Sequence, residues 1–313
     1  MILGANYPWL NYGWDFGLPP PAWTGGRSAQ EFRAEQRRTI AADLRHAADL
    51  GLSVVRWFLL GDGAGAPAAP GHSGVQPLLD DFSAVLDLCA ESRVQLLPSL
   101  IDYRWCLPAA VVAPDVVQGG RASTLFDPRQ RDLFLDGVLE PLLEVSRRRP
   151  AAIHAWEAMN EPEWAARAPR WKFWDHRRSA MQAFLRDAVR RINTSGFVST
   201  IGWAHWRTIR AWKTEDWGLG LQQIHYYAQG GAALPPARGV CDGPCLVGEF
   251  ATSPDQPWPD GARTLEQRVQ RLRDAGYAGA LLWSLRARDS ATRWTPVEQA
   301  QIARIAGRPI PAA

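Results

Sequence analysis

Lysine, cysteine and long apolar stretches are all scarce in this chain of 313 residues. No apolar run approaches the ~20 residues that a membrane-spanning helix requires, so we expect no membrane partner. The net charge is only +3 and no basic cluster is interleaved with aromatic residues, which argues against a nucleic-acid partner. The first residues carry neither the basic segment nor the apolar core of a signal peptide. The sequence as written therefore predicts a cytoplasmic protein, or a secreted one if a leader has been trimmed away.

The cysteines give little support to a metal centre. Cys241 and Cys245 are near enough in sequence to form a disulfide or half of a metal site, and the sequence leaves open whether they are bonded. No second pair of cysteines or histidines follows at zinc-finger spacing, so we expect no metal and no cofactor. Cys89 falls on the apolar stripe of a predicted helix, and we expect it to be a small buried hydrophobe.

Tryptophan, by contrast, is abundant, with 16 residues. Its flat ring either fills the core or forms a half-exposed platform for the apolar face of a ligand such as a sugar, and composition does not distinguish these uses. Hydrophobic residues make up 46% of the chain, which is enough for a large core. Because α/β barrels of ~250 residues or more form one unit, we expect a single domain over residues 1–313 and a monomer.

Short apolar runs alternate with longer amphipathic segments along almost the whole chain. This alternation is typical of βα units arranged around a parallel sheet. The expected strands cover residues 2–6, 53–58, 94–100, 152–159, 197–202, 221–225, 245–250 and 278–284. The expected helices cover residues 28–50, 78–91, 129–148, 177–190, 265–274 and 296–305, with a short one over 206–212 and a loop-like segment over 226–242. Eight such units predict a (β/α)8 TIM barrel.

In such barrels the functional residues lie at the C-terminal ends of the strands and on the loops that follow them. Polar side chains that end apolar strands are costly when they are merely structural, so this rule selects a short set of candidates. The set consists of Asn6, Arg56, Asp102, Asn160, Glu161, His225, Tyr227, Glu249 and Trp283.

Two of these candidates are acids that end strands on roughly opposite sides of the predicted ring. Glu161 follows the fourth strand and Glu249 lies in the seventh. Cleavage of an acetal needs one carboxyl to protonate the leaving oxygen and a second to meet the oxocarbenium-like centre. Because the fourth and seventh strands face one another across the barrel end, these two residues predict a carboxylate pair.

The sequence around these acids resembles a known family. The stretch from Trp156 to Pro162 (WEAMNEP) is similar to the fourth-strand signature of clan A glycoside hydrolases, especially family 5. Gly248-Glu249-Phe250 resembles the nucleophile motif of the seventh strand. Three more matches fall in the expected order and together cover most of the chain: Val55-Arg56-Trp57, His225-Tyr226-Tyr227 and Leu282-Trp283-Ser284.

The resemblance implies a role for each matching residue. Glu161 becomes the acid/base and Glu249 the nucleophile of a retaining enzyme, in which the two carboxyls lie ~5–5.5 Å apart. Arg56 and Tyr227 stabilise the charge of Glu249. Asn160 bonds the sugar 2-hydroxyl, His225 orients Glu161 or a sugar hydroxyl, and Trp283 forms the floor beneath the sugar. Asn6 and Asp102 are further candidates for binding sugar hydroxyls.

Several alternatives stay open at this point. Glu157 lies four residues before Glu161 on the same strand face, although the Asn-Glu-Pro context favours Glu161. Loop tryptophans predict additional sugar subsites, with the candidates Trp9, Trp14, Trp105, Trp164, Trp171, Trp174, Trp203, Trp206 and Trp258. The expected substrate is a β-linked mannan- or glucan-type chain, with mannan favoured. The alternatives are an exo-acting β-glycosidase on short oligosaccharides and a non-catalytic carbohydrate-binding barrel.

Overall fold

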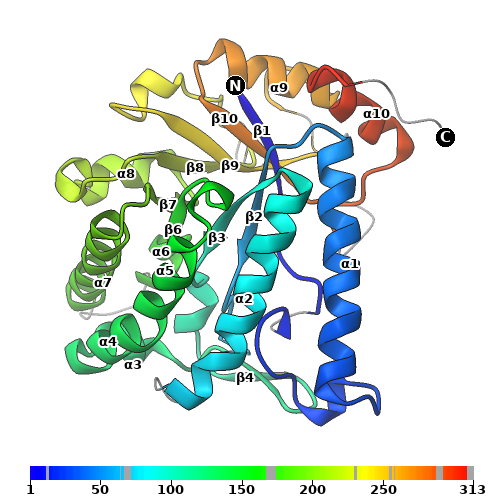
Figure 1. Ribbon diagram of the computed structural model, residues 1–313. Helices are drawn as coiled ribbons and strands as arrows, with labels where there is room; N and C mark the ends of the chain where they lie inside the picture. Colours follow the sequence, from blue (N-terminus) through cyan, green and yellow to red (C-terminus); the bar gives the residue numbers. More distant parts are fainter. Residues whose placement is uncertain are drawn as a thin grey trace.

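Eight parallel strands close into a barrel in the computed structural model (Figure 1). The structure describes residues 1–11, 14–63, 65–66, 72–166, 174–228, 231–253, 256, 258–286 and 292–308. The barrel strands are β1 (Ile2–Asn6), β2 (Val54–Phe58), β3 (Gln95–Ser99), β6 (Trp156–Asn160), β7 (Ser199–Trp203), β8 (Gln222–Tyr226), β9 (Cys245–Ala251) and β10 (Gly279–Trp283). Strand β1 pairs with both β2 and β10, which closes the ring and confirms the predicted (β/α)8 barrel.

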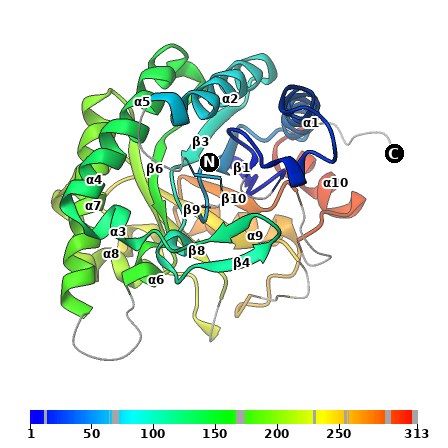
Figure 2. The ribbon, with the colours of Figure 1, turned by 90° about the horizontal axis from the view of Figure 1, so that it is seen from below.

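The helices lie outside this ring, as Figures 1 and 2 show. They are α1 (Ala29–Asp49), α2 (His72–Ser92), α3 (Ala122–Phe126), α4 (Pro128–Phe134), α5 (Glu140–Arg147), α6 (Pro162–Ala166), α7 (Trp174–Thr194), α8 (Trp206–Trp212), α9 (Leu265–Asp274) and α10 (Pro296–Ile305). The long helix expected over residues 129–148 contains a π-helical turn, Leu135–Leu139, between α4 and α5. The segment over 226–242 is loop-like as predicted, and its described residues include the 3-10 turn Ala237–Gly239.

Local sequence signals set several helix ends. The Ser28 side chain accepts a hydrogen bond from the Glu31 amide, and Glu31 reciprocates at the Ser28 amide, which makes a capping box for α1. Thr264 and Gln267 form the same arrangement at the start of α9. Each box satisfies two backbone N–H groups that have no partner within the helix, so these ends were readable from the sequence.

A two-stranded hairpin that the sequence analysis did not predict follows β3. Its strands β4 (Ala110–Ala113) and β5 (Val116–Gln118) lie at the end of the barrel at which the strands terminate (Figures 1 and 2). Val111 and Val117 of this hairpin are exposed. Among the described residues, no helix is both long and apolar enough to cross a membrane.

Candidate active site

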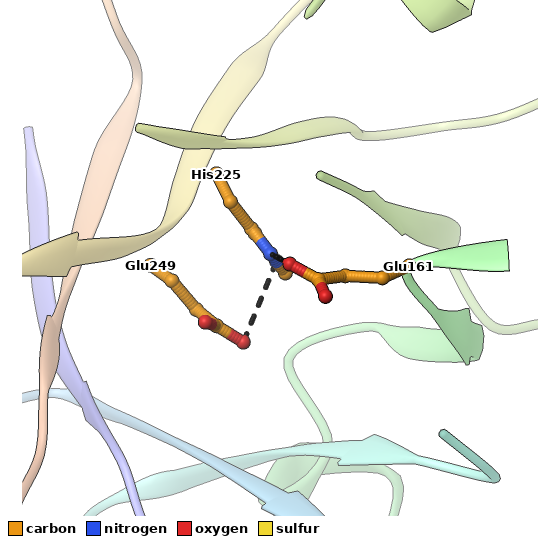
Figure 3. A group of neighbouring side chains, drawn as sticks. All are labelled: Glu161, His225 and Glu249. Atoms are coloured by element: carbon orange, nitrogen blue, oxygen red, sulfur yellow. Dashed lines mark hydrogen bonds and ion pairs between the residues drawn. The ribbon is translucent and has the colours of Figure 1, made fainter. Parts of the chain in front are cut away.

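Glu161, His225 and Glu249 meet at the C-terminal end of the barrel (Figure 3). Glu161 directly follows β6, whereas His225 and Glu249 lie near the ends of β8 and β9. One carboxylate oxygen of each glutamate and a ring nitrogen of His225 all lie within 4.8 Å of one another. Retaining glycosidases hold their two carboxyls ~5–5.5 Å apart, whereas inverting ones leave ~6.5–9.5 Å for a water molecule. The observed spacing has no room for that water.

Glu249 is held on both oxygens and is almost completely buried. Arg56 Nη1 donates to Glu249 Oε1 over 2.7 Å, and the Tyr227 hydroxyl donates to Oε2 over 2.6 Å. Burial and the charge of Glu249 hold the pKa of Tyr227 well above its ordinary value, so this hydroxyl stays a donor. The two donors compensate a negative charge that burial would otherwise make costly and fix the direction of the carboxylate.

Arg56 joins Glu249 to a second acid, Glu157, which lies deeper in the barrel. Arg56 Nε and Nη2 each donate to a different oxygen of Glu157 over 2.6 Å, and the side chains of Arg56 and Glu157 are both fully buried. Ser99 and Gln223 donate to the same carboxylate. Glu157 is therefore a fully bonded partner of Arg56, and its carboxylate is unavailable as an acid toward a substrate.

Two glycines make room for this buried network. A Cβ atom at Gly202 would lie within about 3.0 Å of polar atoms of Arg56 and Glu157, and one at Gly248 would lie 2.6 Å from the Gln223 amide. Such distances are shorter than side chains tolerate, so any larger residue would displace the network. Glycine within a strand commonly marks a close approach of this kind.

We expect Arg56→Ala to lower the free energy of unfolding by about 3–5 kcal/mol, because it leaves two buried carboxylates without their cation. Denaturant titration followed by circular dichroism measures the change. The matched control is Arg147→Ala, which removes an exposed arginine paired with Glu144 and should cost no more than about 1 kcal/mol. A loss for Arg56→Ala as small as that of the control would contradict the prediction.

Asn160 is oriented by hydrogen bonds at both ends of its amide. Its Oδ1 accepts from Arg56 Nη2, and its Nδ2 donates to Asp102 Oδ2, each over 2.6 Å. Burial is the main cause that raises the pKa of Asp102 to about 7. Because Nδ2 carries two protons and Asp102 takes one, the second is left for a ligand hydroxyl. Asp102 thus orients Asn160 from behind and is itself 5% exposed.

Glu161 differs from Glu249 in its surroundings. Its side chain is 17% exposed and contacts His225, whose Nδ1 lies 2.9 Å from Glu161 Oε1. His225 Nε2 lies 3.6 Å from Glu249, so the ring stands between the two carboxylates (Figure 3). Burial disfavours the charged ring, but the two glutamates outweigh burial and hold the pKa of His225 above its ordinary value.

The backbone at Glu161 adopts a left-handed conformation, with φ of 48°. A side chain other than glycine seldom takes this conformation, and such residues cluster at functional sites. The Glu161 amide donates to the Gly202 carbonyl over 2.6 Å, which ties the turn after β6 to the end of β7. The tie directs the Glu161 side chain into the cavity described next.

A cavity of about 620 Å³ opens on the Glu161 side of the carboxylate pair. Glu161, His225 and Tyr227 form its base, whereas Glu249 does not line it. The wall comes from α6, from the connection between β7 and α8 and from α8 itself, and it includes Trp164, His205, Trp206, Arg207 and Trp212. Pockets that hold small organic ligands have volumes of ~300–1,000 Å³, so the cavity is large enough for a ligand of more than solvent size.

The structure brings most of the candidate residues into one hydrogen-bonded group, but two of them, Asn6 and Trp105, lie differently from the expectation. Asn6 is completely buried, and its amide bonds Arg56 and the Gly248 carbonyl, so it supports the network and does not face a ligand. Trp105 is 2% exposed and packs against Phe134, because the turn Tyr103–Cys106 directs its ring into the core. Trp283 ends β10 half-buried beside Ala251, and its expected place beneath the sugar stays a prediction.

Four of the other loop tryptophans divide between core and cavity, whereas Trp9 and Trp14 are half-buried and line neither. Trp203 and Trp258 are buried in aromatic clusters, so the expectation that they line subsites was wrong. Trp164 and Trp206 line the cavity. Trp171 and the Trp174 side chain lie outside the described residues. His205 and Arg207 of the cavity wall were not predicted, because neither residue ends an expected strand.

Within the described part of the chain, Glu161, His225 and Glu249 are also the group closest to the arrangement of metal ligands. However, Glu249 Oε1 already accepts from the Arg56 guanidinium, and a divalent cation on that oxygen would face this positive charge directly. The three side chains are therefore better suited to acid–base and nucleophilic chemistry by a carboxylate pair than to binding a metal ion. Cys241 and Cys245 are buried and form no disulfide with each other, and Cys89 is likewise a buried free thiol.

Comparison with known proteins places the fold but not the family. No family model and no curated protein matches the chain. A β-1,4-mannanase from the sea hare Aplysia kurodai is 20% identical with a TM-score of 0.70, over 99% of this chain and 95% of that one. A β-1,4-D-mannanase from Cryptopygus antarcticus is 18% identical with a TM-score of 0.74, over 98% and 90%. An exo-β-1,4-mannosidase from Opitutaceae bacterium strain TAV5 is 17% identical with a TM-score of 0.60, over 98% and 59%. The chain thus has the barrel fold of these mannan-cleaving enzymes.

Proposed function

We propose that the chain is a retaining β-glycoside hydrolase that resembles family 5 and cleaves a β-mannan chain at internal bonds. The observation that carries the proposal is the carboxylate pair, with oxygens within 4.8 Å of each other and unequal surroundings. One acid is clamped by a cation and a phenol, and the other faces a cavity. A double displacement needs this asymmetry, because one carboxyl must attack while the other carries a proton.

In the first step Glu249 attacks the anomeric carbon and a glycosyl ester forms. The bond to the leaving oxygen breaks as Glu161 gives that oxygen its proton. Arg56 and Tyr227 keep the attacking carboxylate directed and partly neutralised until the neutral ester forms, after which the negative charge resides on Glu161. The second N–H of Asn160 Nδ2 donates a hydrogen bond to the sugar hydroxyl next to the reacting carbon. This contact strengthens in the transition state.

In the second step Glu161, now ionised, takes a proton from water, and the water oxygen attacks the anomeric carbon. The ester bond breaks, Glu249 is released as a carboxylate, and the β configuration is restored. His225 lies between the two acids and reaches Glu161 Oε1, so it keeps that carboxyl in place through both protonation states.

The cavity suits a leaving group that is itself a sugar chain, which both internal cleavage and the removal of a terminal sugar release. It lies beside the proton donor, which is the side on which the leaving group departs, and its volume of about 620 Å³ suits a leaving group of more than one sugar. Trp164 and Trp206 provide aromatic faces there for stacking. Mannan is the proposed polymer because the fold is that of the mannan-cleaving enzymes named above.

Incubation with β-mannan, β-glucan and xylan tests the proposal. We expect β-mannan to lose viscosity early and to yield a ladder of oligosaccharides, with Glu249→Ala as the inactive control. Release of single sugars alone would favour the exo-acting enzyme. If none of the polymers and no aryl β-glycoside is cleaved, a binding barrel without catalysis replaces the proposal.

A further inference from the structure

Glu163 is a buried acid that the mechanism above does not use. It lies on α6, two residues after Glu161, and it is 5% exposed. Among the described residues no cation pairs with it, which is unusual because a buried carboxyl without a counter-charge lowers stability. Burial is the main cause that raises the pKa of Glu163 to about 7, and the nearby charge of Glu161 adds to it.

One contact of Glu163 joins two connections of the barrel. Its Oε1 accepts a hydrogen bond from the backbone amide of His205, over 3.0 Å and across 42 positions of the chain. His205 precedes α8 and lines the cavity, and its ring meets the edge of the Trp164 ring at 5.5 Å between centroids. The carboxyl therefore lies between the turn that carries the proton donor and the wall of the cavity.

A second tie runs parallel to this one. The Glu161 amide donates to the Gly202 carbonyl at the end of β7, three residues before His205. Together the two bonds hold the turn after β6 against the connection after β7 at two points. This matters because Glu161 has a left-handed backbone, which persists only when its surroundings impose it.

We propose that Glu163 is a positioning residue. It holds the carboxyl of the proton donor Glu161 in the correct place relative to the cavity that receives the leaving group. The proposal rests on the proposed function, in which Glu161 protonates the leaving oxygen. A misplacement of about 1 Å at a reacting group can lower a rate ~100-fold, so a single hydrogen bond in this place has a measurable effect.

The test compares Glu163→Ala with Glu163→Gln on substrates with different leaving groups. A dinitrophenyl leaving group departs without a proton, whereas a sugar requires one. We expect Glu163→Ala to lower kcat/KM ~10–100-fold on a β-linked oligosaccharide and less than about threefold on the dinitrophenyl glycoside of the same sugar. Glu163→Gln keeps the acceptor for the His205 amide and should retain most of the wild-type kcat/KM on the oligosaccharide.

Hydrogen exchange at the His205 amide gives a readout that needs no activity. It should be faster in Glu163→Ala and unchanged in Glu163→Gln. The matched control is Asp81→Ala, which removes another buried acid that ties the Gly17 amide to Arg33 far from the site. It should lower stability without changing the dependence on the leaving group or the exchange at His205.

Three results would overturn the positioning role. They are an equal loss on both leaving groups in Glu163→Ala, no loss on either leaving group, and unchanged exchange at the His205 amide. If the wild-type chain cleaves neither substrate, the proposed function fails, and the exchange measurement alone still decides whether Glu163 holds the connection.

Discussion

Substitution of Glu249 by alanine is expected to lower kcat/KM on aryl β-glycosides at least ~10⁴-fold, since it removes the group that attacks the anomeric carbon. Glu157 cannot replace it because it is fully bonded behind Arg56, and Glu161 cannot because it serves as the acid/base. The fold should survive, because Arg56 keeps both contacts to Glu157. Steady-state kinetics and circular dichroism measure the two effects.

Added azide tests directly whether Glu249 is the nucleophile, because it can replace the missing carboxylate in Glu249→Ala. Azide is a small anion that fits the space left by the side chain, and attack from that face yields the α-glycosyl azide from a β-glycoside while the aryl group leaves. We expect azide to restore cleavage and this product to appear. The control is Glu144→Ala, an exposed acid on α5 that should behave as wild type. A Glu249→Ala variant with wild-type activity would disprove the nucleophile assignment.

Substitution of Glu161 by glutamine is expected to lower kcat by ~10²–10⁴-fold on substrates with a sugar leaving group. Glutamine retains the shape of the side chain and a partner for His225 but cannot donate the catalytic proton. A dinitrophenyl glycoside needs no proton in the first step, so the glycosyl ester should form normally and then accumulate. The result is a burst of dinitrophenol followed by slow turnover, with kcat and KM lowered together.

Stopped-flow measurement across a series of aryl leaving groups checks this expectation. The loss in Glu161→Gln should grow steadily as the leaving group becomes poorer, while the wild type changes little. The control is again Glu144→Ala, which should follow the wild type. A loss of the same size for every leaving group would show that Glu161 does not supply the proton.

The arrangement of strands and helices was largely predictable. Strand ranges such as 2–6 and 245–250 match β1 and β9 to within one residue, and α9 and α10 match fully. These elements depend on periodicity and on caps such as Ser28, which are properties of neighbouring residues. The β4–β5 hairpin was missed because its short strands carry no such period.

The candidate site was predictable where it depends on strand ends. Glu161, His225 and Glu249 were selected because residues at the ends of parallel strands meet, and the structure brings them together. Side-chain direction was not predictable for loop residues. Trp105 and Trp164 both lie in connections after strands, but only Trp164 lines the cavity. Which ring turns inward depends on packing partners elsewhere, such as Phe134 for Trp105.

By itself, the amino-acid sequence determined that the chain forms eight βα units and that two acids end strands on opposite sides of the ring. Only the tertiary structure decided which polar groups neutralise one another. Arg56 meets Glu157 across 101 positions and Glu249 across 193, and Glu163 reaches the His205 amide in another connection. The physical reason is that periodicity and capping act between neighbours, whereas burial of a charge is tolerated only through partners that closure of the barrel brings into contact.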